Sequence, residues 1–299
     1  MVVVPSADAP IGMFDSGLGG LTVARAVIDL LPHEDIVYFG DTARTPYGPR
    51  DADEVRRFAI EIMDLLIAQD VKLVVMACNA AASAALHEVR HRYDVPVLSV
   101  IDPGIRAAIA ATRNRRIGLI GTQVTVRSGS YDQALGATRA NVTLVSQACP
   151  LFVDFVERGD TTSDELVKVA EEYLDPLKKE GVDTLILACT HYPLLTGVIK
   201  YVMGDGVVLI SSAQVTADDV YARLREKDLL RSTDRSGVHR FIASSEKGMF
   251  GELGRRFLGP EFGQVEYRAW GDPSETNAGR LDREQGQDRE QGQDRAQGQ

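Results

Sequence analysis

Two stretches of the chain, LVVMACNAAASAAL (Leu73–Leu86) and LILACTHYPLL (Leu185–Leu195), decide how it folds. Each begins with a short apolar run typical of a buried strand, continues through Ala-Cys and a polar residue, and passes into a helical pattern. A strand that leads through a tight turn into a helix is the repeating unit of α/β folds. Because the plan occurs twice, we expect two similar units, each with a cysteine at its strand-to-helix turn.

The alternation of strand and helix extends outward from both stretches. The runs predicted to be strands are Ile11–Phe14, Ile36–Phe39, Leu73–Met76, Val97–Val100, Ile117–Ile120, Val142–Val145, Thr184–Leu187 and Val207–Ile210. The stretches predicted to be helices are Leu21–Leu31, Asp53–Ala68, Ala80–Tyr93, Ile105–Thr112, Thr162–Lys179, Leu194–Val202 and Thr216–Lys227. Near-continuous apolar strands indicate mostly parallel sheets flanked by helices, so the predicted fold class is α/β.

The domain organisation follows from a weak internal repeat. The segments IGMFDSG and IGLIGT, which start at Ile11 and Ile117, open the two halves in the same way. We predict a discontinuous first α/β domain of residues 1–101 plus 213–270 and a second α/β domain of residues 102–212, with the active site in the cleft between them. The segment 213–270, with HRFIASS as a possible strand and a helix near Lys247–Phe257, returns to the first domain because it would bury too little surface alone.

Residues 271–299 differ in composition from the rest of the chain. From Asp282 the sequence reads DREQGQ, DREQGQ and DRAQGQ, three copies of one hexapeptide without apolar residues. Such a segment cannot offset its ordering entropy by burying surface. We therefore expect a disordered tail.

Composition excludes several classes of protein. The formal charge of -10 argues against a sequence-independent nucleic-acid binder, which would carry a basic face. Apolar runs are all shorter than the roughly 18 residues that a membrane span needs. The start of the chain, MVVVPSADAP, has no basic region before its short apolar stretch, so it does not resemble a signal peptide. We expect a cytoplasmic protein with neither nucleic-acid nor membrane partners.

The three cysteines, Cys78, Cys149 and Cys189, are expected to be free thiols, because their number is odd and no two lie close in sequence. Cys149 is expected to be a buried structural thiol. Cys78 and Cys189 follow strands at matching positions, where ligands bind in open α/β sheets. The helix amides beyond them favour a thiolate there.

Two opposed thiols fit few reactions. Redox pairs commonly have Cys-x-x-Cys spacing, which is absent, and zinc sites need more ligands than the pair Cys189 and His191, so no metal is expected. Inversion of a stereocentre, by contrast, needs a base on one face of a carbon and an acid on the other. One ionised and one protonated thiol meet that need in either direction.

The sequence resembles the glutamate racemases. The motifs that carry the resemblance are GMFDSGLGGLTV (Gly12–Val23), GDTARTPYG (Gly40–Gly48), ACNAAAS (Ala77–Ser83), FVERG (Phe155–Gly159) and LACTHYPLL (Leu187–Leu195). They occur in family order over nearly the whole chain up to about Leu258. The resemblance implies racemisation of glutamate without pyridoxal phosphate, metal or other cofactor, supply of D-glutamate for peptidoglycan, and assembly as a homodimer.

The resemblance also implies roles for individual residues. Cys78 would act on the proton of D-glutamate and Cys189 on that of L-glutamate, while His191 would tune or relay the proton of Cys189. The other residues implied to be catalytic or substrate-binding are Asp15, Ser16, Pro46, Tyr47, Gly48, Asn79, Ala80, Glu157 and Thr190. Asp15 would steer the substrate ammonium group or help a thiol exchange protons, with capping of the helix near Gly20 as the structural alternative.

One departure from the family pattern occurs at Ala80, where the family usually has Thr or Ser after the Asn. The missing hydroxyl removes one potential hydrogen bond to a substrate carboxylate, worth about 1.5–3 kcal/mol if nothing replaces it. Water, Ser83 or a backbone amide could replace it. Two other functions remain open at this point: racemisation of aspartate or another acidic amino acid, and non-catalytic amino-acid binding.

Overall fold

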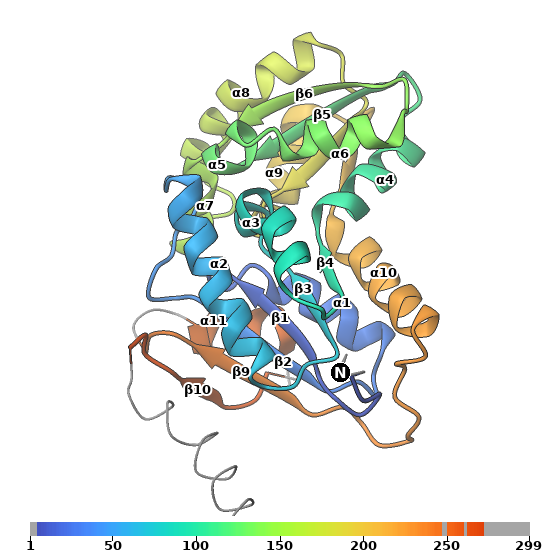
Figure 1. Ribbon diagram of the computed structural model, residues 1–299. Helices are drawn as coiled ribbons and strands as arrows, with labels where there is room; N and C mark the ends of the chain where they lie inside the picture. Colours follow the sequence, from blue (N-terminus) through green and yellow to red (C-terminus); the bar gives the residue numbers. More distant parts are fainter. Residues whose placement is uncertain (1–4, 247–249, 260–261, 272–299) are drawn as a thin grey trace, which may run out of the picture.

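The computed structural model describes residues 5–246, 250–259 and 262–271. Its strands form a six-stranded sheet in the order β10-β9-β2-β1-β3-β4 and a four-stranded sheet in the order β6-β5-β7-β8 (Figure 1). Every strand pair in both sheets is parallel. The predicted class, α/β with two parallel sheets flanked by helices, is confirmed.

The elements have the following bounds. The first sheet contains β1 (Ile11–Asp15), β2 (Ile36–Gly40), β3 (Leu73–Met76), β4 (Val97–Ser99), β9 (His239–Ala243) and β10 (Val265–Tyr267). The second sheet contains β5 (Arg116–Gly121), β6 (Thr143–Ala148), β7 (Thr184–Ala188) and β8 (Val208–Ile210). The helices are α1 (Leu21–Leu30), α2 (Ala52–Ile67), α3 (Asn79–Arg92), α4 (Ile101–Ala111), α5 (Gln123–Arg127), α6 (Ser130–Thr138), α7 (Leu151–Glu157), α8 (Asp164–Lys179), α9 (Thr196–Met203), α10 (Ser212–Glu226) and α11 (Phe250–Leu258), with a 3₁₀ turn at Tyr192–Leu195.

The central strands are buried on both faces. In β1, alternate side chains enter different cores: Phe14 packs into one buried cluster, whereas Ile11 and Met13 pack into another on the opposite face of the sheet. This two-residue period is the geometry of a strand whose successive side chains point to opposite faces. A third cluster, with Phe152 and Leu174, lies within the second unit.

Several helices differ from the expectation. Helix α4 begins at Ile101, four residues before the predicted start at Ile105, and includes Pro103 in its first turn, where a missing backbone N–H costs little. The short helices α5, α6 and α7 were not predicted, since elements of five to nine residues show too few turns for a clear apolar period.

In the C-terminal part of the chain, some elements match the prediction and others were not predicted. The possible strand at HRFIASS is confirmed as β9, which pairs with β2, while the three-residue edge strand β10 was not predicted. Helix α11 lies within the predicted helical region, of which residues 247–249 are outside the described residues. The predicted disordered tail, 271–299, also lies outside them, apart from Gly271. The domain boundaries near residues 101 and 212 stay a prediction.

None of the helices in the described part of the chain is both long enough and apolar enough to span a membrane.

Candidate active site

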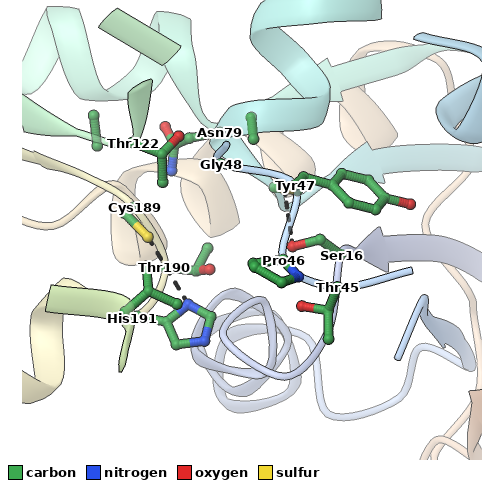
Figure 2. Close-up of a pocket in the computed structure, with 14 residues that line it drawn as sticks. Ser16, Thr45, Pro46, Tyr47, Gly48, Asn79, Thr122, Cys189, Thr190 and His191 are labelled. Atoms are coloured by element: carbon green, nitrogen blue, oxygen red, sulfur yellow. Dashed lines mark hydrogen bonds between the residues drawn. The ribbon is translucent and has the colours of Figure 1, made fainter. Parts of the chain in front are cut away.

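A cavity lies where loops from the carboxyl ends of both sheets face each other (Figure 2). Its lining residues are Ser16, Thr45, Pro46, Tyr47, Gly48, Cys78, Asn79, Ala80, Thr122, Val153, Ala188, Cys189, Thr190 and His191. Its volume is about 20 Å³, close to the space of a single water molecule. The two units therefore close tightly over the site.

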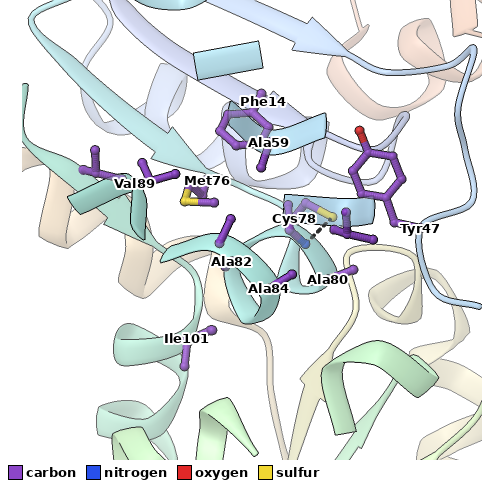
Figure 3. Packing of buried hydrophobic residues seen from close by; sticks show 14 of the residues in the cluster. Phe14, Tyr47, Ala59, Met76, Cys78, Ala80, Ala82, Ala84, Val89 and Ile101 are labelled. Carbon is purple, nitrogen blue, oxygen red and sulfur yellow. Dashed lines mark hydrogen bonds between the residues drawn. The ribbon is translucent and has the colours of Figure 1, made fainter. Parts of the chain in front are cut away.

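Cys78 sits at the junction of β3 and α3, where it caps the helix. Its Sγ accepts a hydrogen bond from the Ala81 N–H at 3.5 Å and donates to Ser16 Oγ at 3.6 Å. Figure 3 shows the thiol among small side chains of α3, including Ala80 and Ala82, which let the helix pack closely on the sheet.

The ionisation of Cys78 differs from the expectation. Burial, followed by the nearby Asp15 carboxylate, raises the pKa of the Cys78 thiol far above its ordinary value, although the Ala81 amide and Ser16 act in the opposite direction. The predicted preference for thiolate is wrong for this cysteine, because desolvation and a like charge outweigh the Ala81 and Ser16 amides and the Ser16 hydroxyl. The surroundings of Cys78 thus favour the protonated thiol.

Cys189 lies in the corresponding turn after β7, beside an imidazole. Its Sγ is 3.8 Å from His191 Nδ1, and His191 Nε2 is 3.6 Å from Glu157 Oε1 at the end of α7. Burial lowers the pKa of His191, but Cys189 and Glu157 raise it more, to about 10. His191 therefore carries a positive charge at neutral pH next to the second thiol, and Glu157 lies behind it, outside the cavity lining.

Asp15, at the end of β1, lies behind the lining rather than in it. The side chain is fully buried, and Oδ2 accepts a hydrogen bond from the Gly20 N–H at 2.7 Å, at the start of α1. The capping contact named as the structural alternative is therefore present. Ser16, the next residue, does line the cavity and lies between Asp15 and Cys78.

The loop after β2 brings Pro46, Tyr47 and Gly48 to the cavity. The Tyr47 ring is buried, and its hydroxyl points away from Cys189 (Figure 2) and donates to Asp41. Tyr47 thus lines the cavity, while its hydroxyl group holds the loop in place through the hydrogen bond to Asp41.

Asn79 is fixed by a residue from the other unit. Tyr131 in α6 donates its hydroxyl to Asn79 Oδ1 at 2.6 Å, and both side chains are buried. Because the oxygen of the amide is used in this way, its Nδ2 group is the half that can donate to a carboxylate. Ala80 lines the cavity beside it, whereas the Ser83 hydroxyl bonds to that of Ser130 at 2.8 Å and is absent from the lining.

Two glycines allow the units to approach each other. A Cβ atom on Gly19 would lie 2.2 Å from Thr190 Oγ1, and one on Gly48 would lie 2.9 Å from Thr122 Cβ. In each pair, the glycine belongs to a loop of the first sheet and the threonine to a loop of the second. The closed cavity therefore requires glycine at both positions.

The described residues include no group of three or more His, Cys, Asp or Glu side chains placed to hold a metal ion. What the cavity does hold is one buried thiol from each unit, Cys78 beside Ser16 and Cys189 beside His191.

Comparison with known proteins decides the family. Residues 21–220 match the Asp/Glu/Hydantoin racemase family. The chain belongs to this family. A glutamate racemase of Beutenbergia cavernae is 54% identical over 270 residues, which cover 86% of this chain and 92% of that protein.

Solved structures agree with this assignment to the Asp/Glu/Hydantoin racemases. A glutamate racemase isoform from Bacillus anthracis matches with a TM-score of 0.81 and 40% identity, covering 87% of this chain and 97% of that one. A glutamate racemase of Francisella tularensis, solved in complex with D-glutamate, matches with a TM-score of 0.83 and 33% identity, covering 88% and 98%.

The sequence analysis did not predict Thr122 as a lining residue, although the internal repeat of the chain indicates it. The repeat that aligns IGMFDS with IGLIGT pairs Ser16 with Thr122, and both line the cavity. The same symmetry pairs Cys78 with Cys189 and Asn79 with Thr190. Thr45 and Val153, by contrast, have no counterpart in the repeat that would have marked them.

Proposed function

We propose that this chain interconverts L- and D-glutamate by a two-thiol mechanism, in which Cys78 and Cys189 exchange protons with opposite faces of the substrate Cα. Glutamate is the substrate named for the similar proteins, including one at 54% identity over most of its length. The observation that carries the mechanism is that the two thiols reach one cavity from different sheets, in unlike electrostatic surroundings.

Those surroundings support one direction of proton transfer in the resting site. Burial disfavours loss of the proton from the Cys78 thiol, while the positively charged form of His191, which its raised pKa favours, lies beside Cys189 Sγ. Cys189 would therefore remove the Cα proton of L-glutamate, and Cys78 would donate its proton to the opposite face to give D-glutamate. The thiols then stand in exchanged protonation states, which suit the reverse reaction on D-glutamate.

The carbanion-like transition state needs electrostatic stabilisation in a dry site. Asn79 Nδ2, the hydroxyls of Ser16, Thr122 and Thr190, and loop amides are the donors near the thiols. The small cavity volume supports a mechanism in which closure excludes water around the bound substrate. We expect Asp15 and Glu157 to act from behind the lining, by exchanging protons with Cys78 and by holding His191.

We further expect the product D-glutamate to supply peptidoglycan synthesis, and the chain to work as a homodimer in the cytoplasm.

The first test is incubation with L-glutamate in deuterated buffer with chelator present and without added cofactor. Optical rotation should fall to zero, and deuterium should appear at Cα. Loss of rotation with L-aspartate but not with L-glutamate would move the assignment to aspartate racemisation. No turnover of either substrate, with a ligand-induced rise in melting temperature, would indicate a binding protein.

The second test assigns the thiols. Cys78→Ala and Cys189→Ala should each lower kcat by about 10²–10⁴-fold, the range that a positioned acid or base contributes. Cys149→Ala is the matched control, because Cys149 is an equally buried thiol that does not line the cavity. Activity near that of the control in either variant would refute the two-thiol mechanism.

A further inference from the structure

The loop of residues 41–50, here called the substrate loop, joins β2 to α2 and carries Pro46, Tyr47 and Gly48 to the cavity. Its position depends on a buried carboxylate at its first residue. Asp41 is fully buried and accepts hydrogen bonds from four side chains.

Two of the four donors come from the substrate loop itself. Arg44 Nε donates to Asp41 Oδ2 at 2.6 Å, and the Tyr47 hydroxyl donates to the same oxygen. Asp41 therefore holds the substrate loop through its contacts with Arg44 and with the hydroxyl end of Tyr47, which points away from Cys189.

The other two donors come from the C-terminal part of the chain. Ser244, just after β9, donates to Asp41 Oδ1 at 2.8 Å, and the indole Nε1–H of Trp270 donates to the same oxygen at 2.7 Å. The Ser244 hydroxyl also accepts a hydrogen bond from the Ala43 N–H at 2.8 Å. The carboxylate thus links the two parts of the chain, because Oδ2 accepts from the loop and Oδ1 accepts from the C-terminal segment.

Trp270 also packs on the substrate loop directly. The Arg44 guanidinium lies 3.7 Å from the centre of the indole and 4.0 Å from that of the Phe58 ring in α2. The indole makes an edge contact with Phe39 in β2, with ring centres 5.4 Å apart. A cation stacked on aromatic faces holds its side chain in one geometry as well as adding attraction.

We propose that Ser244 and Trp270 are positioning residues that clamp the substrate loop through Asp41 and so set the affinity for substrate. This rests on the proposed racemisation of glutamate. The clamp acts on binding because it holds Pro46, Tyr47 and Gly48 in place without touching the reacting atoms. If a buried carboxylate loses one hydrogen-bond donor, its position becomes less well fixed, and so do those of the other donors bonded to it. The four contacts therefore act together.

The kinetic test uses Trp270→Phe, which keeps an aromatic ring on Arg44 and removes the indole N–H, and Ser244→Ala. Each should raise KM for both enantiomers by roughly 5–10-fold, the size of the net contribution of a single hydrogen bond, with kcat within about twofold of the unmodified chain. Tyr267→Phe, in the same segment but with a half-exposed side chain, is the control that should leave KM unchanged. A residue with a merely structural role would lower the melting temperature without changing KM.

The spectroscopic test uses Trp270 as the only tryptophan of the chain. If the clamp favours substrate binding, bound substrate must favour the clamp by the same factor. Saturating D-glutamate should therefore lower the acrylamide quenching constant of tryptophan fluorescence, and Ser244→Ala should reduce that protection.

A KM for Trp270→Phe within twofold of the unmodified chain would overturn the proposal, as would a quenching constant that glutamate leaves unchanged. Failure of the clamp is distinguishable from failure of the proposed function. An unmodified chain that racemises glutamate, with variants equal to it, refutes the clamp alone, whereas an unmodified chain without turnover refutes the function.

Discussion

At the scale of single residues, the two cysteines hold equivalent places in the repeat but have different chemistry. Cys78 lies near Asp15 in a setting that keeps it protonated, whereas Cys189 lies beside the charged His191. Asp15 reaches Cys78 from the neighbouring strand β1, whereas His191 follows Cys189 by two residues in the same turn. A pair of identical side chains can therefore serve as one acid and one base.

The pH dependence of stability tests the state of His191. Its pKa in the folded protein, about 10, lies above the ordinary value of 6.5. A raised pKa contributes stability that is fully present below pH 6.5 and is lost as the pH rises through about 10. The free energy of unfolding of the unmodified chain, minus that of His191→Gln, should be largest near pH 6 and should shrink towards zero above pH 10 in urea titrations. A difference that grows with pH would contradict the assignment.

Tyr131 gives a second residue-scale prediction, since it orients the Asn79 amide from the opposite unit. Tyr131→Phe leaves the buried Asn79 oxygen without this donor, at a cost of about 1–3 kcal/mol. We expect kcat/KM to fall by roughly 5- to 100-fold, because each 1.4 kcal/mol is a factor of ten.

Tyr93→Phe is the matched control for that experiment. Its hydroxyl also donates to a side-chain oxygen, that of Asp64, but on the exposed surface outside the cavity lining. Its kcat/KM should stay within twofold of the unmodified chain. Equal losses in both variants would show that the Tyr131 contact has no special part in the reaction.

At the scale of elements, the loop between β1 and α1 and the turn after β7 meet through a glycine. Gly19→Ala would place a methyl group 2.2 Å from Thr190 Oγ1 and 2.9 Å from its carbonyl carbon, so the two loops must separate. Because separation misplaces Cys189 relative to Cys78, we expect kcat/KM to fall at least about 100-fold, as for small displacements of catalytic groups.

Gly197→Ala in α9 controls for the loss of a glycine as such. A Cβ atom there meets nothing within 4 Å, and alanine loses less conformational freedom on folding than glycine. This variant should keep its activity and melt at the same or a higher temperature. Full activity in Gly19→Ala would refute the close approach of the two loops.

At the scale of the whole molecule, the cavity of about 20 Å³ is small for an amino acid, and we expect the two units to move apart when substrate enters. Ser83 on α3 and Ser130 on α6 face each other across the units, with 2.8 Å between their hydroxyl oxygens. The double variant Ser83→Cys with Ser130→Cys should form a disulfide that holds the units closed. Oxidation should lower activity at least tenfold, and reduction should restore it.

The single variants Ser83→Cys and Ser130→Cys control for the substitutions themselves and should respond little to oxidation. Full activity of the cross-linked double variant, with the disulfide confirmed by mass spectrometry, would show that substrate reaches the site without opening of the units.

The sequence by itself determined the fold class, the places of the two thiols and most of the cavity lining. The fold class and the places of the thiols depend on local patterns, namely apolar strands, turns at their carboxyl ends and the repeat that pairs Cys78 with Cys189. The other predicted lining residues were implied by the resemblance to the glutamate racemases. The pairing of Ser16 with Thr122 was present in the same repeat. Short helices such as α5 were not predictable, because they offer too few turns to show a period.

Only the tertiary structure decided how the site residues behave. Burial and the charge of Asp15 set the ionisation of Cys78, and Tyr131, 52 residues away in the chain, orients Asn79. Trp270 reaches Asp41 across 229 residues. The physical reason is that desolvation and hydrogen-bond partners depend on which distant segments pack together, whereas a local pattern specifies only the element in which a residue lies.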